Sequence, residues 1–219
     1  MVLDNYRRSL DWWLVPLAKA CRNVPPDTIT WLSLLAAGAG GILFWLSGPT
    51  HAGILILMGA WVGVGLNSIL DVLDGKVAQL TGQATRRGDY LDHCVDRFSD
   101  AFLIIGLAFS PWAGTGIGIA ALAGTLLTSY MGTQAQAVGQ HRNYAGFLGR
   151  ADRMVLLLFA PLGQAVWTSS GRGPIHIGDL ETNWLELVLA YFAVVGALTT
   201  VQRFVGGLRG FGPDGEIRR

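Results

Sequence analysis

Charged residues are scarce in this chain of 219 residues: Asp, Glu, Lys and Arg make up 14% of it, against 51% hydrophobic residues. Soluble domains average about 25% charged residues, so this composition excludes an ordinary soluble domain and indicates an integral membrane protein. Cysteine is also rare. Cys21 and Cys94 fall in segments that we place near the cytoplasm, where thiols stay reduced, so no disulfide framework is expected.

Apolar runs long enough to cross a bilayer recur along the chain. A spanning helix needs about 20 residues, and thirty glycines suit the close packing of such helices in lipid. We predict that residues 1–219 form a single all-α, membrane-embedded domain with six transmembrane helices within 28–207. The expected spans are about 28–46, 88–110, 116–137, 150–167 and 184–205, together with a second span that runs from about residue 52 past Asn67 and ends among the aspartates that begin at Asp71.

Residues 4–24 precede these spans and have apolar side chains at helical spacing, interleaved with basic ones. Leu10, Leu14 and Leu17 mark the apolar face. This pattern predicts an amphipathic helix that lies in the membrane interface. The prolines that begin at Pro25 then end this helix and start the next.

Basic residues are distributed asymmetrically. All sixteen Lys and Arg residues except Arg172 fall on the side shared by the N-terminus, the loops after the second and fourth spans, and the C-terminus. The positive-inside rule therefore predicts a cell-membrane protein with both termini and the aspartates of residues 71–100 on the cytoplasmic side. The opposite ends of the spans carry an expected outer belt of aromatic residues, namely Trp45, Trp112, Trp167 and Trp184.

Six aspartates fall within residues 71–100, between apolar segments. A charge near the bilayer centre costs about 2.5–3.5 kcal/mol on insertion scales, so such a cluster is expected to be functional. Asp71 and Asp74 share one face of a helix, and Asp92 and Asp96 share one face of the next. Two helices joined by a short link can point these faces at each other. Converging carboxylates predict a site for hard divalent cations.

A structural alternative is that these aspartates only form internal ion pairs. We expect some pairing, particularly for Asp89 and Asp100. The available cations in this stretch are Lys76, Arg86, Arg87 and Arg97. Ion pairing does not explain the two glycines and the alanine that accompany the aspartates at fixed spacing, so we favour a catalytic site.

The stretch resembles the motif of the CDP-alcohol phosphotransferase family, D-x2-D-G-x2-A-R-x8-G-x3-D-x3-D. The matching residues, with every gap preserved, are Asp71, Asp74, Gly75, Ala78, Gly88, Asp92 and Asp96. The departure is Gln79, where the family has Arg; an amide lacks the charged fork with which a guanidinium binds phosphate. Lys76 or Arg87 are the nearby cations that can substitute. The resemblance to the family covers about residues 5–210.

The resemblance implies an enzyme that moves a lipid phosphoryl group from a CDP-activated lipid, CDP-diacylglycerol or CDP-archaeol, to the hydroxyl of a polar alcohol, with release of CMP. It also implies that Asp71, Asp74, Asp92 and Asp96 hold Mg²⁺ or Mn²⁺, and that Asp96 deprotonates the acceptor. The nucleotide is expected at Thr28, Thr30, Asn67, Asp71, Gly75, Ala78, Thr85 and Gly88. Two ions are expected because four carboxylates and a diphosphate cannot share a site unaided: like charges about 4 Å apart repel by about 4 kcal/mol at an effective dielectric constant near 20.

Three arginines near the cytoplasmic ends of the last two spans indicate which kind of acceptor the enzyme uses. Arg150 and Arg153 are three residues apart on one helix face, and Arg203 is embedded in an apolar run where a charge needs a partner. Their segments resemble those of phosphatidylinositol phosphate synthases, in which basic residues bind the acceptor's phosphate, although residues 129–136 lack the Lys and Arg usual there. We expect a phosphorylated polyol such as inositol phosphate or glycerol phosphate. Pairing of Asp152 with one of the arginines is the structural alternative.

Two other classes of membrane protein use aspartates at this depth. A cation transporter would show a polar route to both faces, whereas the outer halves of these spans are apolar and no inverted repeat is evident. An intramembrane prenyltransferase would carry paired D-D-x-x-D-type motifs, which are absent.

The remaining expectations concern partners and secondary residues. Besides its substrates, the protein is expected to contact membrane lipids and no nucleic acid. The small residues Gly114, Gly118 and Ala121 are expected to pack helices within the chain, and the family resemblance permits a homodimer. His93 follows Asp92 but points off its helix face, so we expect a packing or supporting role for it.

Overall fold

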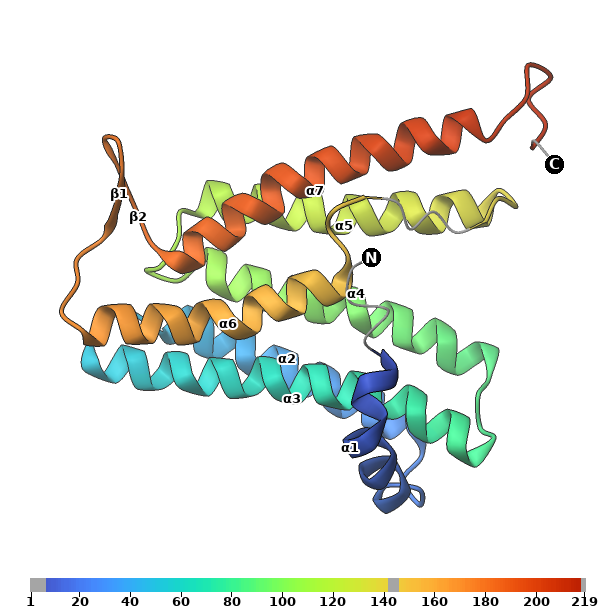
Figure 1. Ribbon diagram of the computed structural model, residues 1–219, viewed down its shortest axis with the longest axis horizontal. Helices are drawn as coiled ribbons and strands as arrows, with labels where there is room; N and C mark the ends of the chain where they lie inside the picture. Colours follow the sequence, from blue (N-terminus) through green and yellow to red (C-terminus); the bar gives the residue numbers. More distant parts are fainter. Residues whose placement is uncertain (1–6, 142–145, 218–219) are drawn as a thin grey trace.

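The computed structural model describes residues 7–141 and 146–217, and most of them are helical (Figure 1). The helices are α1 (Arg7–Ala20), α2 (Pro26–Leu46), α3 (His51–Thr81), α4 (Arg86–Ala108), α5 (Thr115–Ala137), α6 (Arg150–Ser169) and α7 (Trp184–Arg209). A hairpin of β1 (Ile175–Ile177) and β2 (Leu180–Thr182) lies between α6 and α7. The predicted all-helical membrane fold is confirmed, and each expected span corresponds to one helix.

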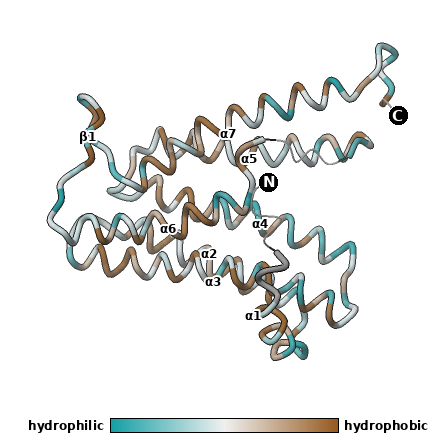
Figure 2. The backbone as a smooth tube through the Cα atoms, in the orientation of Figure 1, coloured by the Kyte–Doolittle hydropathy of each residue, from teal (hydrophilic) through white to brown (hydrophobic). Residues whose placement is uncertain are grey.

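Four of these helices, α2, α3, α5 and α7, are long and apolar enough to cross a membrane. The sequence predicts α4 and α6 as spans as well, but neither reaches that apolar length within the described residues. The reason is charge: α4 carries charged side chains from Arg86 as far along as Asp100, and α6 begins with Arg150. Figure 2 shows the hydrophilic first turns of α4 beside the mostly apolar bodies of the spans.

Helix α1 corresponds to the predicted interfacial helix, but it is shorter than residues 4–24, of which 4–6 lie outside the described residues. Its Ala18 is fully buried against Ile29 of α2 and against Leu73 and Val77 of α3. The helix is therefore packed onto the bundle through one face and does not rest on lipid alone.

Helix α2 organises the part of the bundle that carries the aspartates. It packs against both α3 and α4, whereas these two make few direct contacts with each other. Glycine permits the close approach on both sides: a Cβ at Gly63 of α3 would lie 2.8 Å from Gly40 Cα, and a Cβ at Gly106 of α4 would overlap the carbonyl of Gly41. Close packing through small residues, as predicted, fixes α3 and α4 on either side of α2.

Helices α5 and α7 pack together along their length and join the rest of the bundle through α4 and α6. A Cβ at Gly118 of α5 would overlap Ala108 of α4. Gly118 therefore serves packing within the chain, as the sequence predicted.

The hairpin marks the end of the molecule opposite the α3–α4 turn (Figure 1). The sequence predicted only a loop here, because two strands of three residues carry too little periodicity to identify. Gly178, a glycine in the left-handed region with φ +61°, allows the tight turn between the two strands. Trp112 also differs from the predicted outer belt: it is 3% exposed, and its indole Nε1 donates to Ser47 Oγ at 2.8 Å.

Candidate active site

Aspartates from two helices meet beside the turn that joins α3 to α4. Asp71 and Asp74 belong to α3, and Asp92 and Asp96 to α4. Asp74 interacts electrostatically with Asp71 and Asp92, and Asp96 interacts with the same two. The structure thus points the two predicted carboxylate faces at each other.

Local signals in the sequence build this turn. Helix α3 ends at Gly82, which adopts a left-handed conformation with φ 69°. Thr85 then caps α4, its Oγ1 accepting a hydrogen bond from the N–H of Gly88 at 3.0 Å. The predicted nucleotide residue Thr85 is exposed, but its hydroxyl already serves this cap.

The first turn of α2 closes one side of the site. Thr30 Oγ1 donates to Asp74 Oδ2 at 2.6 Å, and Asp27 Oδ2 pairs with Arg87 Nη1 at 2.8 Å. Thr28 lies exposed between these two contacts. The structure therefore places the segment around Thr28 and Thr30 next to the aspartates, although Arg87 is engaged by Asp27.

Gly75 and Ala78 lie on the turns of α3 beyond Asp74. Gly75 is exposed, and a Cβ at this position would meet no atom within 4 Å. Packing within the protein therefore does not require this glycine. The open space is what a ligand would need in order to approach the helix backbone.

Asn67 does not fit its predicted contact with the nucleotide. Its side chain is fully buried, and Nδ2 donates to Ser33 O at 3.0 Å and to Ser99 Oγ at 3.2 Å. Asn67 thus ties α3 to α2 and α4 and has no exposed surface for a substrate.

Arg150 reaches into the aspartate cluster from the start of α6. Its Nη1 lies 2.7 Å from Asp96 Oδ1 and also donates to Asp71 Oδ2. One guanidinium therefore bridges carboxylates of α3 and α4. The alternative partner named from the sequence, Asp152, instead accepts the backbone N–H of Gly149 at 3.0 Å as part of the α6 cap.

Arg153 and Arg203 are engaged elsewhere, so the three arginines do not converge on one point as the sequence had suggested. Arg153 Nη2 pairs with Asp100 Oδ2 at 2.6 Å, and these side chains are only 2% and 1% exposed. Arg203 donates to the carbonyl of Thr128 on α5 at 2.6 Å. The pairing expected for Asp100 is present, with a partner 53 residues away that the sequence did not indicate.

Arg97 completes this network of charges. Its Nη2 lies 3.3 Å from Asp96 Oδ2 and 3.8 Å from Asp100 Oδ2, and its Nη1 donates to Ser129 of α5. Asp96 thus lies between two guanidiniums on one side and the carboxylates of Asp71 and Asp92 on the other.

The donor atoms of the cluster fit a hard divalent cation. Asp71 Oδ1 is buried and accepts no hydrogen bond from the described residues, and a buried oxygen of this kind is costly unless a ligand or ion meets it. Asp92, His93 and Asp96 each offer an atom within 4.8 Å of the other two. Carboxylate oxygens gathered from two helices are the ligands that Mg²⁺ and Mn²⁺ take.

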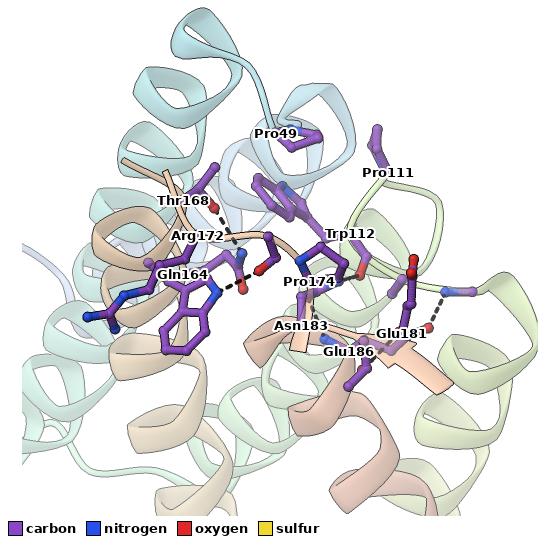
Figure 3. A pocket seen from close by; sticks show the side chains of 15 residues that line it. Pro49, Pro111, Trp112, Gln164, Thr168, Arg172, Pro174, Glu181, Asn183 and Glu186 are labelled. Carbon is purple, nitrogen blue, oxygen red and sulfur yellow. Dashed lines mark hydrogen bonds between the residues drawn. The ribbon is translucent and has the colours of Figure 1, made fainter. Parts of the chain in front are cut away.

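A pocket of about 550 Å³ lies at the opposite end of the bundle, beneath the hairpin (Figure 3). Its polar groups bond mainly to one another: Gln164 Oε1 accepts the N–H of Trp184 at 2.9 Å, and Glu186 accepts the N–H of Gly114 at 3.0 Å. Arg172 stacks on Trp167, 4.7 Å from the ring centre. This pocket contains none of the predicted site residues, and its hydrogen bonds connect neighbouring segments of the fold.

Comparison with known proteins agrees with the aspartate site. The family model of the CDP-alcohol phosphatidyltransferases matches residues 23–201. A phosphatidylinositol phosphate synthase of Cutibacterium acnes is 29% identical over 217 residues, covering 93% of this chain and 96% of the relative. An archaetidylinositol phosphate synthase of Pyrococcus horikoshii is 29% identical over 147 residues, covering 67% of this chain and 74% of the relative.

Solved structures of a Mycobacterium tuberculosis phosphatidylinositol phosphate synthase share the fold. The complex with manganese and citrate superposes with a TM-score of 0.70 at 26% identity, covering 94% of this chain and 93% of that one. The complex with CDP-DAG gives a TM-score of 0.71 at 24% identity, covering 94% and 98%.

These comparisons confirm the predicted enzyme class and its dependence on Mg²⁺ or Mn²⁺, and they give no support to a transporter. They also agree with a location in the membrane, since a further relative, 31% identical over 144 residues, is an inner membrane protein of Escherichia coli. With the motif spacing preserved and its aspartates facing one another across two helices, this chain belongs to the CDP-alcohol phosphatidyltransferase family.

Proposed function

We propose that this enzyme transfers the phosphatidyl or archaetidyl group of a CDP-activated lipid to the hydroxyl of inositol phosphate. The observation that carries the choice of acceptor is Arg150, whose guanidinium lies among the aspartates. A phosphorylated acceptor can take over this guanidinium, because Arg binds phosphate through paired charged hydrogen bonds. The relatives named as inositol phosphate synthases support the same acceptor class.

In this proposal Asp71, Asp74, Asp92 and Asp96 hold the divalent ions. Bound there, the ions would neutralise the diphosphate and stabilise the charge that develops on the attacking and leaving oxygens. Asp96 lies one helical turn beyond Asp92, so its carboxylate can accept the proton of the acceptor hydroxyl. Asp96 is also buried, which limits competition from water for that proton.

The nucleotide would lie along α3 and the first turns of α2 and α4. Gly75 leaves the backbone of α3 open to approach. Ala78, Thr28 and Gly88 border the same region, and Thr30 holds Asp74 in place through its hydrogen bond. Lys76 lies one residue beyond Gly75 and is the cation that we assign to the role that Arg has at position 79 in other members.

The three arginines have different proposed roles: two bind the acceptor's phosphate and one positions other side chains. Arg150 would exchange its contacts with Asp71 and Asp96 for the acceptor's phosphate once the ions are bound. Arg203, held by Thr128 O, would contribute a second positive charge from α7. Arg153 would act indirectly, by fixing Asp100 and through it the position of Arg97.

The acceptor is tested by measuring CMP release from CDP-diacylglycerol with inositol phosphate, glycerol phosphate or unphosphorylated inositol. We expect turnover with inositol phosphate and little with inositol. Arg203→Ala should lose activity toward the phosphorylated acceptor, whereas the matched change Arg172→Ala at the opposite end should not. Equal turnover of inositol and its phosphate by the unmodified enzyme would end the assignment.

We further propose that α4 and α6 also cross the membrane, which gives six spans in one domain with the aspartate site facing the cytoplasm. Basic residues gathered at the α3–α4 turn and at the start of α6 support this orientation. The test introduces Gln83→Cys or Asp179→Cys into a chain with Cys21 and Cys94 replaced by Ser. An impermeant maleimide applied to intact cells should label only position 179; labelling of position 83 alone would reverse the topology.

A homodimer remains a prediction that the family resemblance permits. The mass of the purified protein in detergent, measured by light scattering with the detergent contribution subtracted, would decide it.

A further inference from the structure

The side chain of His93 lies among the groups proposed to hold metal. One of its ring nitrogens lies within 4.8 Å of carboxylate oxygens of both Asp92 and Asp96. The residue follows Asp92 directly and precedes Asp96 by three positions, so the helix brings it onto the side that Asp96 occupies. Its side chain is 39% exposed, so a role in core packing does not explain this position.

Asp89 provides a second contact for the ring. His93 Nε2 lies 3.6 Å from Asp89 Oδ1, one helical turn earlier. Histidines that bind metals usually direct one ring nitrogen to a carboxylate, which orients the ring and leaves the other nitrogen for the ion. In this arrangement the contact with Asp89 would orient the ring, and the ring nitrogen that lies near Asp92 and Asp96 would be the one offered to an ion.

We infer that His93 supplies a nitrogen ligand to a divalent ion held by Asp92 and Asp96, and that it biases this site toward Mn²⁺. The inference rests on the proposed function of the aspartates. It adds a donor of another chemical type, because imidazole is softer than carboxylate. Mg²⁺ prefers oxygen ligands and gains little from an imidazole, whereas Mn²⁺ accepts both.

The family motif does not require this residue, since position 93 falls among its unspecified positions. The preference for Mn²⁺ would therefore be a property of this chain. The competing explanation is a surface pair between His93 and Asp89 with no metal involved. That explanation predicts that no His93 nitrogen binds the ion. A spectroscopic measurement on bound Mn²⁺ can detect such a nitrogen directly.

The experiment uses the full chain in nanodiscs, loaded with Mn²⁺ and studied by electron spin echo envelope modulation. We expect modulation from a directly bound ¹⁴N, which changes to the ¹⁵N pattern when histidine is labelled. His93→Ala and the closer mimic His93→Gln should both abolish it, whereas His176→Ala on β1 should retain it. In the same variants, affinity for Mn²⁺ should fall by about tenfold and affinity for Mg²⁺ should change little.

The outcomes separate this inference from the proposed function. Bound Mn²⁺ that requires Asp92 but shows no nitrogen modulation would overturn the role of His93 and leave the aspartate site intact. Modulation that persists in both His93 variants would overturn it as well. Failure to bind Mn²⁺ or Mg²⁺ at all would instead contradict the proposed metal site, and with it the inference.

Discussion

The two ends of the helical bundle both hold polar residues among apolar helices, but the hydrogen bonding of these residues differs between the ends. At the hairpin end, Gln164 and Glu186 bond to backbone N–H groups of neighbouring segments. At the α3–α4 end, aspartates face one another, and Asp71 Oδ1 is left without a hydrogen bond from the described residues. Polar groups that satisfy one another hold a fold together, whereas buried charge that the chain leaves unsatisfied indicates a ligand. The hairpin pocket shows that a cavity alone does not locate an active site.

Removal of the metal ions should have the largest effect on activity, because it acts on the aspartate end of the bundle and leaves the hairpin end unchanged. We expect excess chelator to abolish CMP release and added Mg²⁺ or Mn²⁺ to restore it, because the carboxylates and the diphosphate repel one another without the ions. Thermal unfolding measured alongside would show whether the fold survives chelation. Full turnover in excess chelator would show that the aspartate end needs no metal ion, and would contradict the proposed metal site.

Substitution of the proposed base should have the next largest effect. Asp96→Asn keeps the shape of the side chain but cannot accept the acceptor's proton, so the rate should fall by about 10²–10⁴. Binding of CDP-lipid, measured by calorimetry, should largely persist. A variant with near-normal turnover would show that another residue is the base.

Asp100, one turn beyond Asp96, tests the boundary of the site. Asp100→Asn leaves Arg153 with a buried, uncompensated charge, so the free energy of unfolding should fall by about 3–5 kcal/mol. Turnover per folded molecule should fall far less than for Asp96→Asn. Asp100→Asn combined with Arg153→Met should regain much of the stability, since neither charge then remains. If Asp100 proved essential for chemistry and Asp96 dispensable, the site would be one turn out of register.

The smallest effect is expected at the hairpin end. Glu186 accepts hydrogen bonds from Gly114 N–H and from Thr182 Oγ1, both at 3.0 Å. Glu186→Gln keeps one acceptor, so stability should fall by about 1 kcal/mol. Turnover at saturating substrate should not change. A selective loss of turnover in this variant would mean that the hairpin pocket takes part in catalysis.

The sequence by itself determined the helices and the faces that carry the aspartates. These features depend on local rules: apolar length defines a span, and a spacing of three or four residues places Asp71 with Asp74 and Asp92 with Asp96. The fixed gaps of the family motif follow from the same periodicity. The position of a helix and the face on which its aspartates lie depend only on residues of that helix and its neighbour in the sequence. These features could therefore be predicted without coordinates.

Only the tertiary structure decided which charges meet. Arg150 contacts Asp71 across 79 residues, Arg153 contacts Asp100 across 53, and Asn67 is buried against Ser33 and Ser99. Helical periodicity gives the face on which such a side chain lies, but not the helix that covers that face. That choice depends on how closely the backbones approach, which contacts such as Gly41 with Gly106 set. It also depends on the low dielectric of the interior, where a buried charge such as that of Arg153 is costly unless an opposite charge meets it.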